Sequence, residues 1–383
     1  MRILVVSTMV PAPPDRGDRI RGYEMLHAFR QFGEVRLFLI GSGQPSAPAD
    51  AALKALDVKI DTFEVSRLER VKGIVEAMMS NRPWASWRVP RINAMLAARG
   101  QWDVVVGFQL KSAYFASSIP AGLHILELTD SLGLYRTEMP VGANVLRWLS
   151  LSGADQEEAK WAASFDTAIV SSERDAEEIV RRSFSASVKV VENGAMAWTS
   201  PVTSQGMKDA LLFIGSLHYP PNRDGLVWFL RDVWPTIVAT QPDMQLRVVG
   251  EGPRGAERWV RGSGVSWVGY ASDLTPEYNR AVALVCPIRY GTGTRRKILG
   301  AWAAGVPVVS TTRGAQGLDY ISQEHLLLAD AAHEFTSAVR ILRESPETWR
   351  RLSRAGWEHV RSRYDSLRAW NVTLHEILAE HSQ

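Results

Sequence analysis

The stretch that organises this chain runs from Cys286 to Asp319 and has the sequence CPIRYGTGTRRKILGAWAAGVPVVSTTRGAQGLD. It predicts the end of a buried strand, a Gly-rich loop, a helix that opens at Thr294, an apolar strand at Val306–Ser310, and another loop of small residues. Such an alternation of strand and helix is typical of a parallel α/β sheet.

Three consecutive cations stand in the first turn of the predicted helix: Arg295, Arg296 and Lys297. With Thr294 as N-cap, the free N–H groups of that turn point into the loop. Cations are disfavoured at a helix N-terminus unless an anion lies between them. We therefore predict a phosphate site in which Gly291 and Gly293 let the backbone approach the anion and Arg295 and Lys297 bind it. The alternative is a solvated basic turn in front of a core helix.

Length and composition limit the classes of protein to consider. A chain of 383 residues exceeds the size of one hydrophobic core, so two domains are expected. The sequence has no run of about 18 apolar residues, and its first residues predict a strand and lack the cleavage site of a signal peptide. We expect a cytoplasmic protein.

The charged and sulfur-containing residues exclude other classes. The only cysteine, Cys286, lies in an apolar run, which excludes an internal disulfide. No Asp-x-Asp motif or His/carboxylate cluster has the spacing of a metal site, so we expect neither a metal nor another cofactor. Lys and Arg number 44 against 41 Asp and Glu, an excess too small to predict binding to nucleic acid.

Short apolar runs separated by helical patterns fill the first half of the chain and predict a parallel sheet covered on both faces. These runs are Arg2–Thr8, Val35–Ile40, Val58–Val65, Val104–Phe108, His124–Thr129, Thr167–Val170 and Val188–Val191.

The loop after the first strand, with the helix predicted at Ile20–Phe32, faces the edge of the sheet where ligands bind. Gly17 suits close approach of a ligand there, and Asp18, Arg19 and Arg21 are placed to reach a substrate; the alternative is a helix start with surface charges.

Asp130 follows the strand His124–Thr129, where its carboxylate is a candidate polar contact for substrate. The alternative is that Asp130 only caps the next helix.

Two stretches rich in Trp and Arg have the composition of an interfacial helix on an anionic membrane. The first carries Trp84 and Trp87, and the second is a long helix predicted over Val145–Phe165 with Trp148 and Trp161. Two interpretations stay open: peripheral contact with the inner face of a membrane, and packing inside the protein.

The residues 193–208 have no hydrophobic periodicity and predict a linker between domains. Beyond it, strands are predicted at Leu211–Ile214, Leu246–Val249, Val265–Val268 and Ala283–Pro287. After the second of these strands, Gly250 and Gly252 form a small-residue loop that lets a ligand lie against the backbone.

The chain from Leu211 to Leu318 resembles the donor-binding segment of GT-B glycosyltransferases of the family-four type, also called glycosyl transferases group 1. The resemblance spans most of the chain. It implies an α/β GT-B fold of two Rossmann-like domains with parallel sheets facing across a cleft. The implied domains are an acceptor-binding domain over 1–192, the linker 193–208, a nucleotide-sugar-binding domain over 209–362, and a C-terminal helix over 363–383 that returns to the first domain.

The same resemblance implies a set of residues that bind the donor. Gly215, Ser216 and Asn222 match positions that face the donor diphosphate, and Tyr270 flanks the nucleotide base. A basic pair typical of the family is not obvious, which leaves more of the phosphate binding to Arg295 and Lys297. The full predicted donor set is Gly17, Gly215, Ser216, Asn222, Gly250, Gly252, Tyr270, Gly291, Gly293, Thr294, Arg295, Lys297 and Gly300.

Gly300 departs from the family pattern. It stands where a Glu usually binds the ribose hydroxyls, and Thr292 stands near where an earlier Glu contacts the sugar. Losing a charge-assisted contact costs about 1.5–3 kcal/mol, and glycine inside a helix costs about 1 kcal/mol against alanine. A glutamate at position 300 should therefore improve both donor binding and stability, provided that nothing else fills the space.

The resemblance implies transfer of a sugar from a nucleotide-diphosphate sugar to a glycan, lipid-linked or small-molecule acceptor, as in polysaccharide biosynthesis, with retention of configuration and without a metal. An inverting enzyme would need a general base, and Asp18 and Asp130 are the candidate catalytic residues. The alternative is a catalytically weak partner subunit of a glycan-assembly complex. A dinucleotide-binding dehydrogenase is excluded because the first loop is PAPPDRGDR and not G-x-G-x-x-G.

Overall fold

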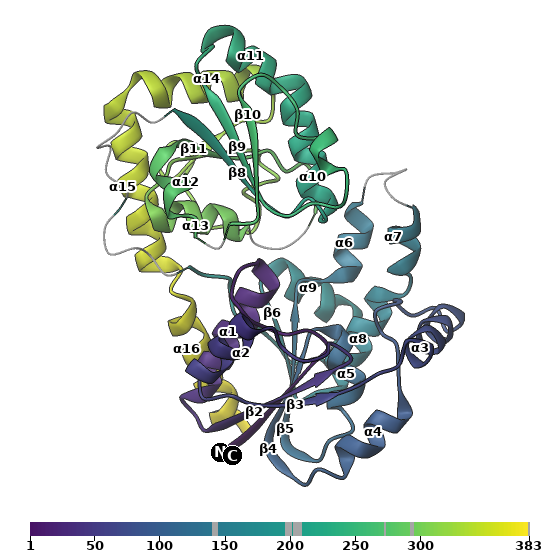
Figure 1. Cartoon of the computed structure of the whole chain (residues 1–383). Helices are drawn as coiled ribbons and strands as arrows, with labels where there is room; N and C mark the ends of the chain where they lie inside the picture. The colour runs from purple at the N-terminus through teal and green to yellow at the C-terminus, as the bar shows by residue number, and fades with distance from the viewer. Residues whose placement is uncertain (140–144, 196–200, 202–208, 272, 292–294, 382–383) are drawn as a thin grey trace. The chain divides into compact units, whose positions relative to one another are not determined.

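The computed structural model describes residues 1–139, 145–195, 201, 209–271, 273–291 and 295–381. Contacts divide the chain into two compact units (Figure 1). Unit 1 holds Met1–Asn193 together with Ser366–Gln383, and unit 2 holds Gly194–Asp365. Most of the predicted linker 193–208 lies outside the described residues.

In the described part of unit 1, seven strands form one parallel sheet in the order β3-β2-β1-β4-β5-β6-β7. The strands are β1 Arg2–Ser7, β2 Glu34–Ile40, β3 Lys59–Phe63, β4 Trp102–Phe108, β5 Ala121–Thr129, β6 Thr167–Val170 and β7 Val188–Val190. The central strands are buried almost throughout because helices cover both faces, which explains their continuous apolar runs.

The helices of unit 1 alternate with these strands, and the last helix of the chain joins them. They are α1 Gly17–Arg30, α2 Ala47–Ala55, α3 Arg67–Met79, α4 Pro90–Ala97, α5 Leu110–Ala116, α6 Leu132–Glu138, α7 Val145–Ser150, α8 Ala154–Ser164, α9 Glu173–Arg182 and α16 Ser366–His381. α16 packs against α1, with Trp370 and Leu374 in the same core cluster as Met25 and Phe29.

In the described part of unit 2, six parallel strands follow the order β10-β9-β8-β11-β12-β13. They are β8 Ala210–Ile214, β9 Gln245–Val249, β10 Val265–Gly269, β11 Ala281–Cys286, β12 Val308–Ser310 and β13 Leu327–Leu328. The helices are α10 Pro220–Trp228, α11 Trp234–Thr240, α12 Thr275–Arg280, α13 Arg296–Ala304, α14 Ala332–Glu344 and α15 Pro346–Arg363.

A one-turn π-helical segment, Phe229–Val233, joins α10 to α11. It ends two residues before Pro235, which has no N–H to donate and whose ring crowds the preceding turn, so the helix widens there.

Each sheet has one point at which the direction of strand addition reverses. In unit 1 this point lies between β1 and β4, and in unit 2 it lies between β8 and β11. Loops that leave the carboxyl ends of two such strands run in opposite directions and leave a crevice for a ligand. The loops after β8 and β11 are those in which the sequence predicts the donor site.

The predicted strands are all present, most of them with shifted ends, and two helix predictions need correction. α13 begins at Arg296 with Arg295 at the N-cap position, whereas the sequence predicted an opening at Thr294, which lies outside the described residues. The long helix predicted over Val145–Phe165 is broken into α7 and α8. The break falls at Gly153, whose φ of 68° is left-handed and ends a right-handed helix.

Candidate functional site

Lys297 and Asn222 meet where the loops after β8 and β11 diverge. Lys297 lies in the first turn of α13, which follows β11, and Asn222 lies in α10, which follows β8. The Lys297 Nζ donates a hydrogen bond to Asn222 Oδ1 at 2.7 Å and lies 4.9 Å from the centre of the Phe213 ring. A cation is therefore held at the reversal point of the unit 2 sheet.

Gly215 lets this pair approach the end of β8. Asn222 Nδ2 donates to the carbonyl of Ser216 at 2.9 Å, so the amide bridges the β8 loop and the lysine. A Cβ at position 215 would lie 2.6 Å from Asn222 Nδ2 and 2.8 Å from Lys297 Nζ. Only glycine therefore allows the ammonium group this close to the backbone.

Burial lowers the pKa of Lys297 to about 8, and the charge of Arg295 acts in the same direction while Cys286 opposes it. No carboxylate in the described ranges pairs with Lys297. A partly desolvated ammonium group without an acidic partner gains free energy when an anion binds.

The other two predicted cations of the first turn contact backbone. Arg295 is only 7% exposed and donates from Nη2 to the carbonyl of Gly291 at 2.7 Å, so it does not belong to a solvated turn. Arg296 donates from Nη1 to the carbonyl of Gly194 at 3.3 Å. Lys297 is thus the cation that reaches the β8 loop.

The Gly-rich loop is described only in part, because Thr292, Gly293 and Thr294 lie outside the described residues. Gly291 has a left-handed φ of 107°, and a Cβ there would lie 3.0 Å from Pro221 and 3.1 Å from the Tyr219 hydroxyl. The loops after β8 and β11 are therefore packed against each other on this side.

The two glycines after β9 both make room for other parts of unit 2, whereas the sequence predicted that they let a ligand lie against the backbone. Gly250 lies against the β8 loop, because a Cβ there would be 2.2 Å from the carbonyl oxygen of Gly215. Gly252 makes room for protein, since its Cβ would lie 2.6 Å from Ala256 and 3.1 Å from Trp267. Tyr270 follows β10 and is 50% exposed.

Gly300 lies three residues after Lys297 on α13, and positions three apart lie on neighbouring parts of one helix face. Among the described residues, and leaving aside the backbone of α13 itself, a Cβ at Gly300 would meet one atom within 4 Å, the hydroxyl oxygen of Tyr278 at 2.9 Å. Tyr278 is 5% exposed, and burial raises the pKa of its phenol. The sequence analysis missed Tyr278 because nothing near it in the sequence relates it to Gly300.

In unit 1 the predicted residues of the first loop have different environments. Gly17 is the first residue of α1, and Asp18 in the same turn forms an ion pair with Arg16 at 2.9 Å. Arg19 pairs with Asp15. The expectation that Arg21 reaches a substrate is wrong, because its side chain is fully buried and pairs with Glu127 at 2.5 Å.

Asp130 lies at the carboxyl end of β5, close to two buried acids, Asp175 and Glu158. Its Oδ1 accepts a hydrogen bond from Ser171 Oγ at 2.7 Å. Burial and then the charge of Asp130 raise the pKa of Asp175 to about 6. Ser131, not Asp130, caps α6, so the helix-cap interpretation of Asp130 is wrong.

The second buried acid, Glu158, holds the start of α6. It accepts hydrogen bonds from Leu132 N at 2.5 Å, Ser131 Oγ at 2.8 Å and Gly133 N at 3.1 Å. Burial is the main reason that its pKa is raised to about 7.

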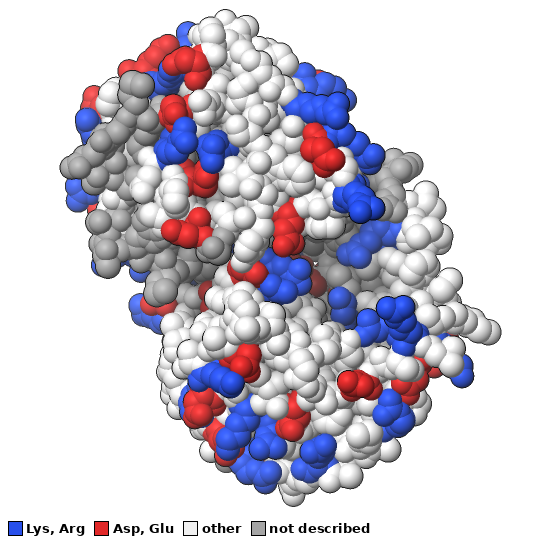
Figure 2. Space-filling view, in the orientation of Figure 1, with Lys and Arg blue, Asp and Glu red and all other residues white. Residues whose placement is uncertain are grey.

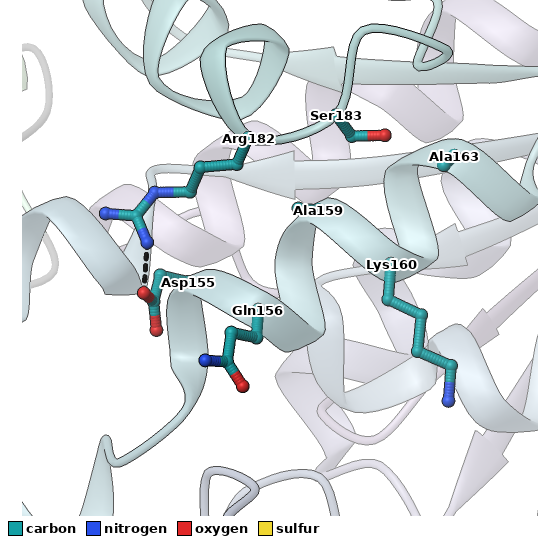
Figure 3. Close-up of a pocket in the computed structure, with 7 residues that line it drawn as sticks. All are labelled: Asp155, Gln156, Ala159, Lys160, Ala163, Arg182 and Ser183. Atoms are coloured by element: carbon teal, nitrogen blue, oxygen red, sulfur yellow. Dashed lines mark hydrogen bonds and ion pairs between the residues drawn. The ribbon is translucent and has the colours of Figure 1, made fainter.

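A separate cavity of about 370 Å³ lies between α8 and α9 (Figure 3). It is lined by Asp155, Gln156, Ala159, Lys160, Ala163, Arg182 and Ser183. The Arg182 guanidinium pairs with Asp155 at one end, whereas Lys160 points away from that pair. None of the predicted site residues lines this cavity.

Among the described residues, no group of three or more His, Cys, Asp and Glu side chains could hold a metal ion. Over those same residues, none of the helices is both long and apolar enough to span a bilayer.

Comparison with known sequences finds a match to a family model over most of unit 2. Residues 208–345 match the family described as Glycosyl transferases group 1. An uncharacterized 44.6 kDa protein in the cps region of Klebsiella pneumoniae is 24% identical over 175 residues. That match covers 43% of this chain and 45% of the relative.

Comparison with solved structures extends the likeness to nearly the whole chain. Alr3699/HepE of Anabaena, in a complex with UDP and glucose, has a TM-score of 0.68 at 14% identity, with 99% of each chain covered. Sucrose-phosphate synthase of Thermosynechococcus elongatus has a TM-score of 0.68 at 17% identity, covering 99% of this chain and 98% of the other. TarM of S. aureus has a TM-score of 0.69 at 9% identity, covering 98% of this chain and 100% of the other.

The predicted fold class and the predicted family resemblance are thus confirmed. The chain has the GT-B fold, and its residues 208–345 match the family described as Glycosyl transferases group 1.

Proposed function

We propose that this chain transfers a sugar from a nucleotide-diphosphate sugar to a glycan, lipid-linked or small-molecule acceptor, with retention of configuration and without a metal. The donor would bind to unit 2 at the reversal point between β8 and β11. The observation that carries the proposal is Lys297, a partly desolvated cation without an acidic partner in the described ranges, held by Asn222 against the end of β8.

A diphosphate at this place would take over the interactions that Lys297 now makes with Asn222. The anion would raise the pKa of the ammonium group and keep it charged. The ammonium group and nearby backbone N–H groups would then stabilise the negative charge that develops on the departing diphosphate, which is work that a metal ion does in other transferases. Gly215, which lets Asn222 and Lys297 lie against the end of β8, would keep the ammonium group close to that backbone when the phosphates bind.

UDP-glucose is the first donor to test. Alr3699/HepE, which has the same fold, was crystallised with UDP, with UDP and glucose, and with UDP-glucose. The exposed ring of Tyr270, two strands from β8, would provide a surface on which the base could stack.

The acceptor would bind to unit 1, where Asp18 and Asp130 remain the candidate catalytic carboxylates. Asp130 lies at the carboxyl end of β5, where its Oδ1 accepts a hydrogen bond from Ser171 Oγ. A role in cytoplasmic polysaccharide biosynthesis, with peripheral contact at the inner face of a membrane, is part of the same proposal. The role in polysaccharide biosynthesis is supported by the similarity to an uncharacterized protein in the cps region of Klebsiella pneumoniae.

A second function is a partner subunit that has the fold but little activity. The observation in its favour is Gly300, because the phenol of Tyr278 lies where a longer side chain on α13 would extend. The two functions predict different results in the same assay.

Isothermal titration of UDP, GDP, ADP and dTDP sugars into the wild type and into Lys297→Gln tests the proposal. The wild type should bind one of these donors, and the variant should bind it at least about tenfold more weakly. Arg350→Gln is the matched control, because Arg350 is an exposed cation of unit 2 on α15 and should leave binding unchanged.

Two results would overturn the proposal. Binding that is equal in the wild type and in Lys297→Gln would exclude the proposed diphosphate site. Binding of a donor without release of its sugar to water or to any acceptor in a mixed glycan and lipid extract would favour the partner subunit.

A further inference from the structure

α3 carries an apolar stripe that no described part of the chain covers. Its exposed fractions are 65% for Leu68, 56% for Val71, 47% for Val75, 50% for Met78 and 85% for Met79. These positions recur every three or four residues, so they lie along one side of the helix. The opposite side, with Gly73 and Ala77, is the buried one.

α7 presents a second exposed apolar surface. Val145 and Leu146 are 63% and 67% exposed, Trp148 and Leu149 are each 44% exposed, and the helix has no buried residue.

Two hydrogen bonds join the segments that follow α3 to the end of α7. The Trp84 N–H donates to the carbonyl of Ser150 at 2.9 Å, and Ser152 Oγ donates to Asn81 Oδ1 at 2.6 Å. The two apolar surfaces therefore belong to the same end of unit 1 (Figure 1).

The charges around the stripe of α3 are unbalanced. Both acids of the helix are paired with arginines outside it, Glu69 with Arg91 and Glu76 with Arg82. The two exposed cations at the borders of the stripe are Arg67 and Lys72, and neither forms an ion pair with any acid in the described ranges. Figure 2 shows largely uncharged atoms at the α3 and α7 end of unit 1, with Lys and Arg atoms and some Asp and Glu atoms beside them.

We propose that α3 and α7 form a surface that binds an anionic lipid bilayer. Apolar side chains on one side of a helix, with cations beside them, are the pattern of a helix that lies in the plane of a membrane interface. The long side chains of Arg67 and Lys72 can reach lipid phosphates while the stripe enters the acyl region. Unpaired cations next to the stripe match an anionic surface, whereas a second copy would bring like charges together.

This surface differs from the one that the Trp-rich stretches predicted. Trp87 and Trp161 are 7% and 9% exposed and belong to the core of unit 1, so they cannot meet a membrane. Trp148 is the tryptophan of those stretches that contributes to the surface. The stripe of α3 was missed because its exposed side has the same spacing as a side that packs in the core.

Sedimentation with vesicles tests the proposal. One set of vesicles contains phosphatidylcholine alone, and the other also contains phosphatidylglycerol. The wild type should bind mainly the second set. The triple variant Leu68→Gln/Val71→Gln/Val75→Gln should bind these vesicles more weakly, by at least about tenfold. The double variant Arg67→Gln/Lys72→Gln should lose about fivefold in vesicle affinity for each charge removed, measured at low salt.

Val372→Gln is the matched control, since Val372 on α16 is 52% exposed, close to Val75, but lies outside the proposed surface. Thermal unfolding should be nearly the same for all variants because every changed side chain is exposed. Equal vesicle binding by the wild type and the triple variant would overturn the proposal, as would absence of binding by the wild type. A wild-type dimer in sedimentation equilibrium that the triple variant abolishes would assign the surface to a second copy instead.

Discussion

At the scale of single residues, the glycine on α13 and the phenol of α12 form a complementary pair. Gly300 leaves room for the Tyr278 hydroxyl, which would lie 2.9 Å from a Cβ at that position. The earlier expectation that a glutamate at position 300 improves stability and donor binding required empty space. That condition is not met in the direction of Tyr278, so we no longer expect a simple gain from Gly300→Glu.

A double-mutant cycle tests this pairing. Gly300→Ala should lower the free energy of unfolding by about 1 kcal/mol, because the clash with a rigid, buried phenol outweighs the gain of about 1 kcal/mol in helix propensity. In the background of Tyr278→Phe, which removes the hydroxyl, the same change should be neutral or stabilising. Urea unfolding gives the free energy of unfolding of all four proteins. Additive effects of the two changes would show that the two residues do not compete for space.

Lys297 makes the proposed donor site dependent on pH. Its pKa of about 8 lies below the ordinary value for lysine, so the free site loses its charge as the pH rises through 8. A bound diphosphate needs the charged form. Donor affinity should therefore fall up to about tenfold per pH unit above 8.

Isothermal titration of UDP at several pH values measures this effect. Lys297→Arg should remove the dependence above pH 8, because a guanidinium stays charged there. In the protein without ligand, the pH dependence of stability has the opposite sign to that of donor affinity. Between about 8 and the ordinary lysine value the unfolded chain binds more protons, so the lysine's contribution makes the folded state more stable as the pH rises. A donor affinity that is constant across pH 8 in the wild type would contradict the role given to Lys297.

At the scale of elements, Gly153 decides where α7 ends and α8 begins. Its φ is 68°, and a Cβ there would lie 1.8 Å from the carbonyl oxygen of Asn81. The close approach lets the segment after α3 pack against the α7–α8 turn. A continuous helix would remove this contact.

A left-handed alanine by itself costs about 1 kcal/mol. Gly153→Ala should destabilise the protein by well over this amount, because its Cβ would also clash with the carbonyl of Asn81. Gly43→Ala is the matched control, because Gly43 has a similar φ of 72° but a Cβ there would have nothing within 4 Å. Thermal and urea unfolding of both variants separate the backbone cost from the clash. Equal losses in the two variants would mean that the contact with Asn81 is not required.

At the scale of the whole molecule, Arg21 connects the two ends of the chain with the middle of unit 1. Its guanidinium donates to Glu127 Oε1, to the carbonyl of Val191 at 2.7 Å and to the carbonyl of Val170 at 3.2 Å. It also lies 5.1 Å from the ring centre of Trp370 on α16. One buried side chain thus links α1, the ends of β6 and β7, and the C-terminal helix.

Arg21→Met should leave the Glu127 carboxylate buried and unpaired, which costs about 3–5 kcal/mol. Glu127→Gln should also destabilise the protein, whereas the pair Arg21→Met/Glu127→Met should lose less than the sum of the single changes. Limited proteolysis should cut α16 first in Arg21→Met. A variant that unfolds at the wild-type urea concentration would show that this network does not hold unit 1 together.

Local patterns in the sequence determined the strands, most of the helices and the α/β alternation, because each depends on residues only a few positions apart. The same local reasoning found the glycines after β9 and β11 and selected Lys297, whereas Gly215 and Asn222 came from the family resemblance. Those residues meet because parallel strands bring their following loops to one edge of a sheet.

Only the tertiary structure decided which partner each polar group meets. Arg21 resembles a surface cation in the sequence, but Glu127, 106 positions away, brings it into the core. Tyr278 and Gly300 come together through the packing of two helices, and the side of α3 that remains exposed depends on which side the neighbouring segments cover. A pattern of a few residues specifies a helix or a strand, whereas a contact between distant positions depends on how the whole chain packs.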